Sequence, residues 1–198
     1  MKKPSPPIYQ LKVTLLDSKP PIWRRILVRS DVRLDIFHRI LQEAMGWMNE
    51  HLHQFTVHGA SYGPHYDESG GELEYENEAR YRLSQLLTTE KDSLNYEYDF
   101  GDGWDHKITL EKILPHDDSV PVPCCINGKR ACPPEDCGGV WGYDSLIETM
   151  GNPNHPEYQE MLEWLGGELN PEAFDLDEIN KALSTFRPKR ASPKTASH

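Results

Sequence analysis

The sequence has no apolar run that approaches the eighteen or so residues needed to cross a membrane. Its start, Met-Lys-Lys-Pro-Ser-Pro-Pro, also lacks the apolar segment of a secretion signal. We therefore expect a cytoplasmic protein with no membrane partner. In a reducing compartment, cysteines are more often free thiols or metal ligands than disulfides.

Positive charge is scarce, because 21 Lys and Arg face 32 Asp and Glu in 198 residues and leave a net charge of −11. An acidic chain repels nucleic acid at long range, which argues against direct nucleic-acid binding, although a local basic patch stays compatible with it. Residues 187–198 contain Arg187, Lys189, Arg190 and Lys194 and no acid. We expect these residues to form a disordered basic tail.

Motifs of established enzyme classes are also missing. There is no His-Glu-x-x-His pattern of a zinc hydrolase. Asp99-Phe100-Gly101 matches a magnesium-binding motif of kinases, but it stands without their Gly-rich loop and His-Arg-Asp segment. We leave the enzymatic status open and favour a protein without catalytic activity.

Alternation of apolar and polar residues predicts several strands. Residues 9–15 and 22–28 alternate on either side of a Pro-containing turn, and residues 51–57 alternate as a third strand. Residues 94–100 and 104–110 flank Gly-Asp-Gly and predict a hairpin with an aromatic face. Residues 59–80 show no sustained period and predict a long surface loop.

Apolar residues at helical spacing predict a helix that ends at Gly46 and three more near residues 143–150, 158–165 and 176–183. This order predicts a single α+β domain over residues 8–186. We expect a mostly antiparallel or mixed sheet, a helix of the N-terminal half packed on it, and a helical C-terminal third. Residues 1–7 and 187–198 are expected to be flexible ends.

The four cysteines lie within fourteen residues, in a segment rich in Gly and Pro. Thiolates are strong zinc ligands, and such loops commonly carry them. One of the adjacent Cys124 and Cys125 is expected to join two later thiols, and His106 or His116 would complete the four ligands. The set that we predict for zinc is Cys124, Cys132, Cys137 and His106. A disulfide and reduced structural thiols remain alternatives, because Cys-x-x-Cys pairs are missing.

A second group of polar residues surrounds the predicted hairpin. His51 and His53 share one strand face, and Asp99 and Asp102 lie near the turn, so a hydrolytic metal site would form if the segments meet. Ordinary turn chemistry also explains Asp102. Arg24, in a predicted strand, is either half of a buried ion pair or an anion contact. The alternative polar site that we predict contains His51, His53, Asp99, Asp102 and Arg24.

Several segments together resemble the plasmid pRiA4b ORF-3-like family: Tyr9-Gln-Leu-Lys-Val-Thr-Leu, Pro20-Pro-Ile-Trp-Arg-Arg-Ile, Gly46-Trp47, His51-Leu-His-Gln-Phe, Tyr96-Glu-Tyr-Asp-Phe-Gly-Asp-Gly-Trp-Asp-His and Arg130-Ala-Cys-Pro-Pro-Glu-Asp-Cys-Gly-Gly-Val-Trp-Gly-Tyr. The resemblance covers about residues 9–183. It implies a compact α+β domain of bacterial and archaeal proteins, often linked to plasmids and mobile elements. Some members are labelled transposon resolvases. It implies no particular catalytic residue.

We therefore expect a binding or interaction module, with a protein as a candidate partner and zinc as a candidate cofactor. A metal-dependent hydrolase or nuclease is the alternative, and a DNA-binding recombination accessory is a further one. The acidic composition and the lack of a helix dense in Lys and Arg weaken the last.

Overall fold

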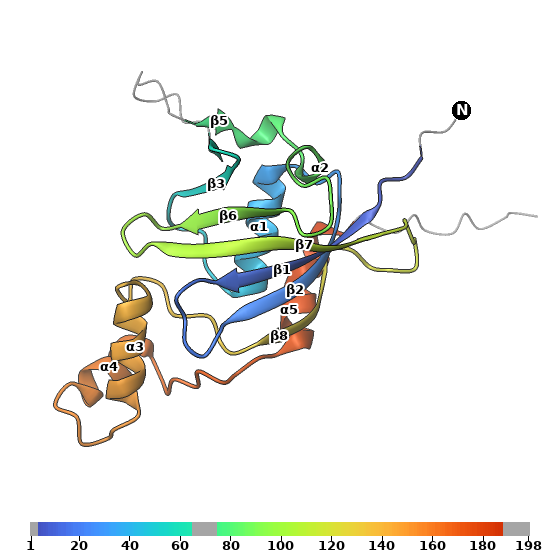
Figure 1. The fold of residues 1–198 in the computed structure, drawn as a ribbon. Helices are drawn as coiled ribbons and strands as arrows, with labels where there is room; N and C mark the ends of the chain where they lie inside the picture. Colours follow the sequence, from blue (N-terminus) through green and yellow to red (C-terminus); the bar gives the residue numbers. More distant parts are fainter. Residues whose placement is uncertain (1–3, 65–74, 188–198) are drawn as a thin grey trace, which may run out of the picture.

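The computed structural model describes residues 4–64 and 75–187, which form an eight-stranded sheet covered by helices (Figure 1). The order of the strands across the sheet is β5-β4-β3-β6-β7-β1-β2-β8. Neighbours pair antiparallel except β4 and β5, which pair parallel. The strands are β1 (Ile8–Leu15), β2 (Trp23–Arg29), β3 (His53–Val57), β4 (Ala60–Gly63), β5 (Glu76–Asn77), β6 (Ser93–Tyr98), β7 (Trp104–Leu114) and β8 (Cys124–Lys129).

Two helices, α1 and α5, cover one face of the sheet, whereas α3 and α4 form a lobe at its end (Figure 1). The helices are α1 (Leu34–Met45), α2 (Leu83–Leu86), α3 (Gly139–Met150), α4 (Tyr158–Leu165) and α5 (Leu176–Leu183), with short 3-10 turns η1 (Glu78–Arg80) and η2 (Ser184–Phe186). None of the described helices combines the length and apolar character that crossing a membrane requires. The predicted α+β class with a mixed sheet is confirmed.

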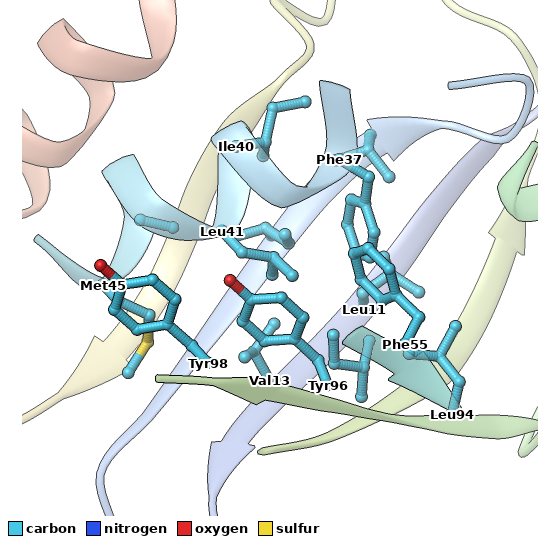
Figure 2. Close-up of a cluster of buried hydrophobic side chains, with 14 of the residues drawn as sticks. Leu11, Val13, Phe37, Ile40, Leu41, Met45, Phe55, Leu94, Tyr96 and Tyr98 are labelled. Carbon is cyan, nitrogen blue, oxygen red and sulfur yellow. The ribbon is translucent and has the colours of Figure 1, made fainter. Parts of the chain in front are cut away.

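The core lies between α1 and the middle of the sheet (Figure 2). Alternate residues of β1, including Leu11 and Val13, point toward the helix, and Phe37 and Leu41 of α1 meet them. Phe37 and Leu41 are 0% exposed, and burial of each such side chain contributes about 1.5–3 kcal/mol. Strand period two and helix period 3.6 therefore explain why these two elements face one another.

The β6–β7 hairpin matches its prediction, except at its tip. Tyr98 pairs with Trp104, and both are fully buried. The strand ends there because Asp99 turns into the left-handed region, with φ of 57°, and its carbonyl accepts from Gly103 N at 2.7 Å. Phe100, which was expected to continue the apolar face, is therefore 45% exposed.

Two segments expected as loops contain strands. Cys124 and Cys125 begin β8, an edge strand paired with β2. The segment 59–80 forms β4, β5 and η1 where it is described. The middle of that predicted loop, residues 65–74, lies outside the described residues, as do residues 1–3 and 188–198 of the predicted flexible ends.

Candidate functional site

A polar pocket of about 500 Å³ opens between α1, residues 49–53 and η1. The helix contributes His38 and Arg39, the segment before β3 contributes His51, the first residue of β3 is His53, and η1 contributes Glu78. The left-handed turn at Gly46, with φ of 101°, ends α1 and sends the chain back along the helix toward this pocket. His38 of α1 and the two histidines after the turn, His51 and His53, thereby line one cavity.

The floor of the pocket is a pair of buried imidazoles. The rings of His38 and His53 are parallel within 1°, and their centroids are 3.4 Å apart. His53 Nε2 lies 2.9 Å from Glu78 Oε2, and all three side chains are buried. Buried polar groups are costly without hydrogen bonds, so the carboxylate of Glu78 compensates the burial of His53.

Hydrogen bonds hold His38 as the neutral tautomer with its proton on Nε2. Nε2 donates to Asn49 Oδ1, and Nδ1 accepts from the hydroxyl of Tyr96 at 2.8 Å. The Tyr96 oxygen in turn accepts from Gln42 Nε2 at 2.9 Å. Burial, followed by the charge of His53, lowers the pKa of His38 to about 3. The ring is therefore an uncharged wall of the pocket near neutral pH.

Three carboxylates surround His51 at the rim of the pocket. Its Nδ1 lies 3.8 Å from Asp99 Oδ2, and its Nε2 lies 3.3 Å from Asp136 Oδ1 and 3.9 Å from Glu135 Oε2. His51, Asp99 and Asp136 each offer one ligand atom, and these atoms lie within 4.8 Å of one another. Of the groups in residues 4–64 and 75–187, this one has the composition and spacing that a metal ion requires.

The alternative polar site predicted from the sequence does not form as one unit. His51 and Asp99 lie together, and His53 lines the same pocket as His51. Asp102 instead accepts a hydrogen bond from Gly138 N at 3.1 Å and so ties the hairpin tip to the start of α3. The structure thus brings His51, His53 and Asp99 near one another, their role as a site stays a prediction, and Asp102 makes a structural contact.

Arg24 lies apart from this pocket and is buried, with no carboxylate partner among the residues that the structure describes. Its Nε donates to Ala44 O at 3.0 Å, and its Nη1 donates to Lys129 O at 3.1 Å. The guanidinium also stacks over Phe174, 5.1 Å from the ring centre. The expected ion pair belongs to the neighbouring Arg25, whose Nε lies 2.6 Å from Glu111. Backbone carbonyls therefore replace the carboxylate expected for Arg24.

The four ligands predicted for zinc are not brought together. Cys124 packs with Ile8 and Leu27 in a small cluster, whereas Cys132 and Cys137 pack against the main core. His106 is fully buried, and its Nδ1 donates to Tyr96 O at 3.2 Å. Among the described residues, the 4.8 Å grouping of candidate ligands contains no cysteine.

Burial also keeps these thiols protonated in the absence of a metal. It raises the pKa of Cys137 to about 12 and that of Cys132 further, and it raises the pKa values of Cys124 and Cys125. A metal binds the thiolate, so each thiol would first have to lose a proton that burial holds in place.

Sequence reasoning missed Glu135 and Asp136, which lie between Cys132 and Cys137. The sequence does show an acidic pair after Pro-Pro, but the neighbouring cysteines are the more usual metal ligands and were chosen instead. Their contact with His51 spans more than eighty residues, and no local pattern shows such a contact.

The likeness to known proteins extends over most of the chain. The profile of the plasmid pRiA4b ORF-3-like protein family matches residues 7–178. The chain belongs to this family. A curated relative, the uncharacterized protein y4hQ of Sinorhizobium fredii (strain NBRC 101917 / NGR234), is 36% identical over 185 residues, which cover 93% of this chain and 94% of the relative.

The family fold is also known from a crystal structure. Protein MM3350 of Methanosarcina mazei Go1, described as a protein of unknown function, superposes with a TM-score of 0.79 and is 37% identical. The match covers 87% of this chain and 97% of that one. The fold of this chain is thus shared with a solved structure from Methanosarcina mazei Go1.

Proposed function

We propose that this protein is a binding module that holds a small anionic molecule in the pocket between α1 and residues 49–53. The volume of about 500 Å³ suits such a molecule. The observation that carries the proposal is the floor of the pocket, where His38, His53 and Glu78 are each about 95% buried. Polar groups are rarely buried together unless they position a structure or a ligand.

One residue of the rim, Arg39, offers a positive charge to an anion, while the carboxylates of Asp35, Glu50 and Glu78 also line the pocket. Arg33 is already paired with Asp35 at 2.6 Å. Arg39 packs over the ring of Phe186 at 5.4 Å, and it forms no ion pair with any residue that the structure describes. Its guanidinium thus keeps donors for a carboxylate or a phosphate, and a planar fork is suited to both.

Titration of the full chain with inorganic phosphate and with succinate tests this function. We expect one of the two probes to bind, and Arg39→Gln to weaken the binding about tenfold, because a charge-assisted hydrogen bond contributes roughly 1.5–3 kcal/mol. Arg80→Gln is the matched control, since Arg80 is exposed and does not line the pocket. No binding of either probe, or equal losses in both variants, would contradict an anion site at Arg39.

A further inference from the structure

The carboxylates around His51 come from two well-anchored segments. Asp99 N donates to Leu52 O at 2.8 Å, and Asp99 Oδ1 accepts from Gly101 N at 2.9 Å. These bonds leave Asp99 Oδ2 facing the ring of His51. The other segment is held by Trp47 Nε1, which donates to Pro133 O at 3.1 Å. The hairpin tip and residues 133–136 therefore converge on one imidazole from opposite sides.

Glu135 has a buried oxygen that receives no hydrogen bond. Its side chain is only 6% exposed. Oε1 accepts from Met48 N at 2.8 Å and from the hydroxyl of Tyr98 at 2.9 Å. Oε2 has no hydrogen-bond donor among the described residues, and it lies 3.9 Å from His51 Nε2, which also makes no hydrogen bond there. A charged oxygen left in this state is costly, and a bound cation would remove that cost.

We propose that His51, Asp99 and Asp136, whose ligand atoms lie within 4.8 Å of one another, bind one divalent metal ion, and that Glu135, whose Oε2 lies 3.9 Å from His51 Nε2, moves in to join them. Carboxylate oxygens suit Mg²⁺ and Mn²⁺, and an imidazole suits Zn²⁺ and other transition metals. One imidazole among carboxylates therefore selects an ion that accepts both, and Mn²⁺ is the probe that fits best. The site lies beside the anion pocket and shares His51 with it, but it stands on its own ligands and not on the proposed ligand of the pocket.

The four side chains differ in solvent exposure, from the buried Glu135 to the exposed Asp136. Glu135 and Asp99 are 6% and 11% exposed, His51 is 27% exposed, and Asp136 is 68% exposed. An ion can thus enter past Asp136 and settle against the buried carboxylates, which supplies the entry path that a metal site needs.

The competing explanation is a protonated His51 that bridges the acids without a metal. The two explanations differ in whether the metal-free protein needs the carboxylate of Asp136 for its stability. A bridging imidazolium needs Asp136 for its own stability, whereas a metal site without its metal is destabilised by crowded carboxylates. Asp136→Asn separates them, because Asn tolerates the positive φ of 57° at this position. We expect this variant, free of metal, to melt at the same temperature as the wild type or above it.

The test is titration of the chelator-treated full chain with Mn²⁺, followed by calorimetry and by electron paramagnetic resonance. We expect one Mn²⁺ per chain, a rise in melting temperature on binding, and affinities at least about tenfold weaker in His51→Ala and Asp136→Asn. The control is His116→Ala, since His116 forms a pair with Asp118 at 2.9 Å that belongs to no larger ligand group in the described chain. We expect this control to bind Mn²⁺ like the wild type.

Three results would overturn the proposal. One is the failure of the wild type to bind Mn²⁺ or Zn²⁺ at about 1 mM, the weak end of specific binding. Another is binding that His51→Ala and Asp136→Asn leave unchanged. The third is Zn²⁺ binding that Cys132→Ser abolishes and His51→Ala does not. Failure of the wild type to bind phosphate or succinate would leave all three outcomes unaffected, so the two proposals fail separately.

Discussion

Residues 132–137 carry two kinds of metal ligand on one short stretch, and the two kinds have different surroundings. Cys132 and Cys137 pack against the core, while Glu135 and Asp136 lie beside His51 at the rim of the polar pocket. Burial keeps the thiols protonated. The carboxylates instead lie near a half-buried imidazole and a path to solvent. The two thiols thus differ from the two carboxylates by their contact with the core in place of His51, although the side chain of Glu135 is itself only 6% exposed.

The histidines divide in the same way. His106 is fully buried, and burial lowers its pKa to about 4. His38 is buried in the pocket floor and is fixed by Tyr96 and Asn49. His51 alone among these three is 27% exposed and has carboxylates on both sides of its ring. We therefore assign a structural role to His106, place His38 in the floor of the proposed anion pocket, and propose His51 as the metal ligand.

The largest expected effect concerns the reactivity of the thiols. A thiol with a pKa of about 12, like Cys137, has roughly a thousandfold less thiolate at pH 8 than an ordinary cysteine, so labelling should slow by about that factor. We expect the folded protein, after treatment with a chelator, to resist a thiol reagent and the unfolded chain to react at all four cysteines. Fast labelling that appears only after the chelator is added would indicate thiolates held by a metal.

A smaller effect is expected when the packing thiol is made more polar. Cys132→Ser replaces a weakly polar side chain by a hydroxyl in a buried setting, and we expect it to lower the free energy of unfolding by about 1–3 kcal/mol. Cys132→Ala, which removes the polar atom, should cost less than the serine variant. Urea unfolding measures both. A loss of bound Mn²⁺ in either variant would contradict the proposal that the carboxylates, and not the thiols, bind the metal.

A third effect concerns acid stability. Burial lowers the pKa of His38 to about 3 and that of His106 to about 4, from an ordinary value of 6.5. Between about pH 6.5 and pH 4 the unfolded chain therefore binds more protons than the folded one, and stability falls as the pH falls. Each histidine adds up to about 1.4 kcal/mol per pH unit to this slope. Unfolding free energies at several pH values should show a shallower slope in His38→Gln, and an unchanged slope would contradict this account.

Much of the fold follows from local patterns in the sequence. Alternation in residues 9–15 predicts β1, and the helical spacing that ends at Gly46 predicts α1, because each element buries one face against the other. The strand β8 was missed because it lies at the edge of the sheet and contains Asn127 and Gly128, which are typical of turns. Its pairing with β2 is a tertiary contact that overrides local preference.

The candidate site was only half predictable for the same reason. His51 and Asp99 stand near recognisable strands, so their proximity could be expected from a sheet that pairs β3 with β6. Glu135 and Asp136 reach the site because Trp47 and Tyr98 anchor the segment from elsewhere in the chain. No spacing in the sequence shows that contact. Thiols at similar positions are the more familiar ligands, and zinc binding by them stays a prediction.

The most direct measurement is a crystal structure of the full chain soaked with Mn²⁺, with anomalous scattering recorded at the manganese edge. Our account predicts one peak about 2.0–2.3 Å from a nitrogen of His51 and from carboxylate oxygens of Asp99, Glu135 and Asp136. A peak beside Cys132 or Cys137, or no peak at His51 in a crystal that contains the ion, would contradict it.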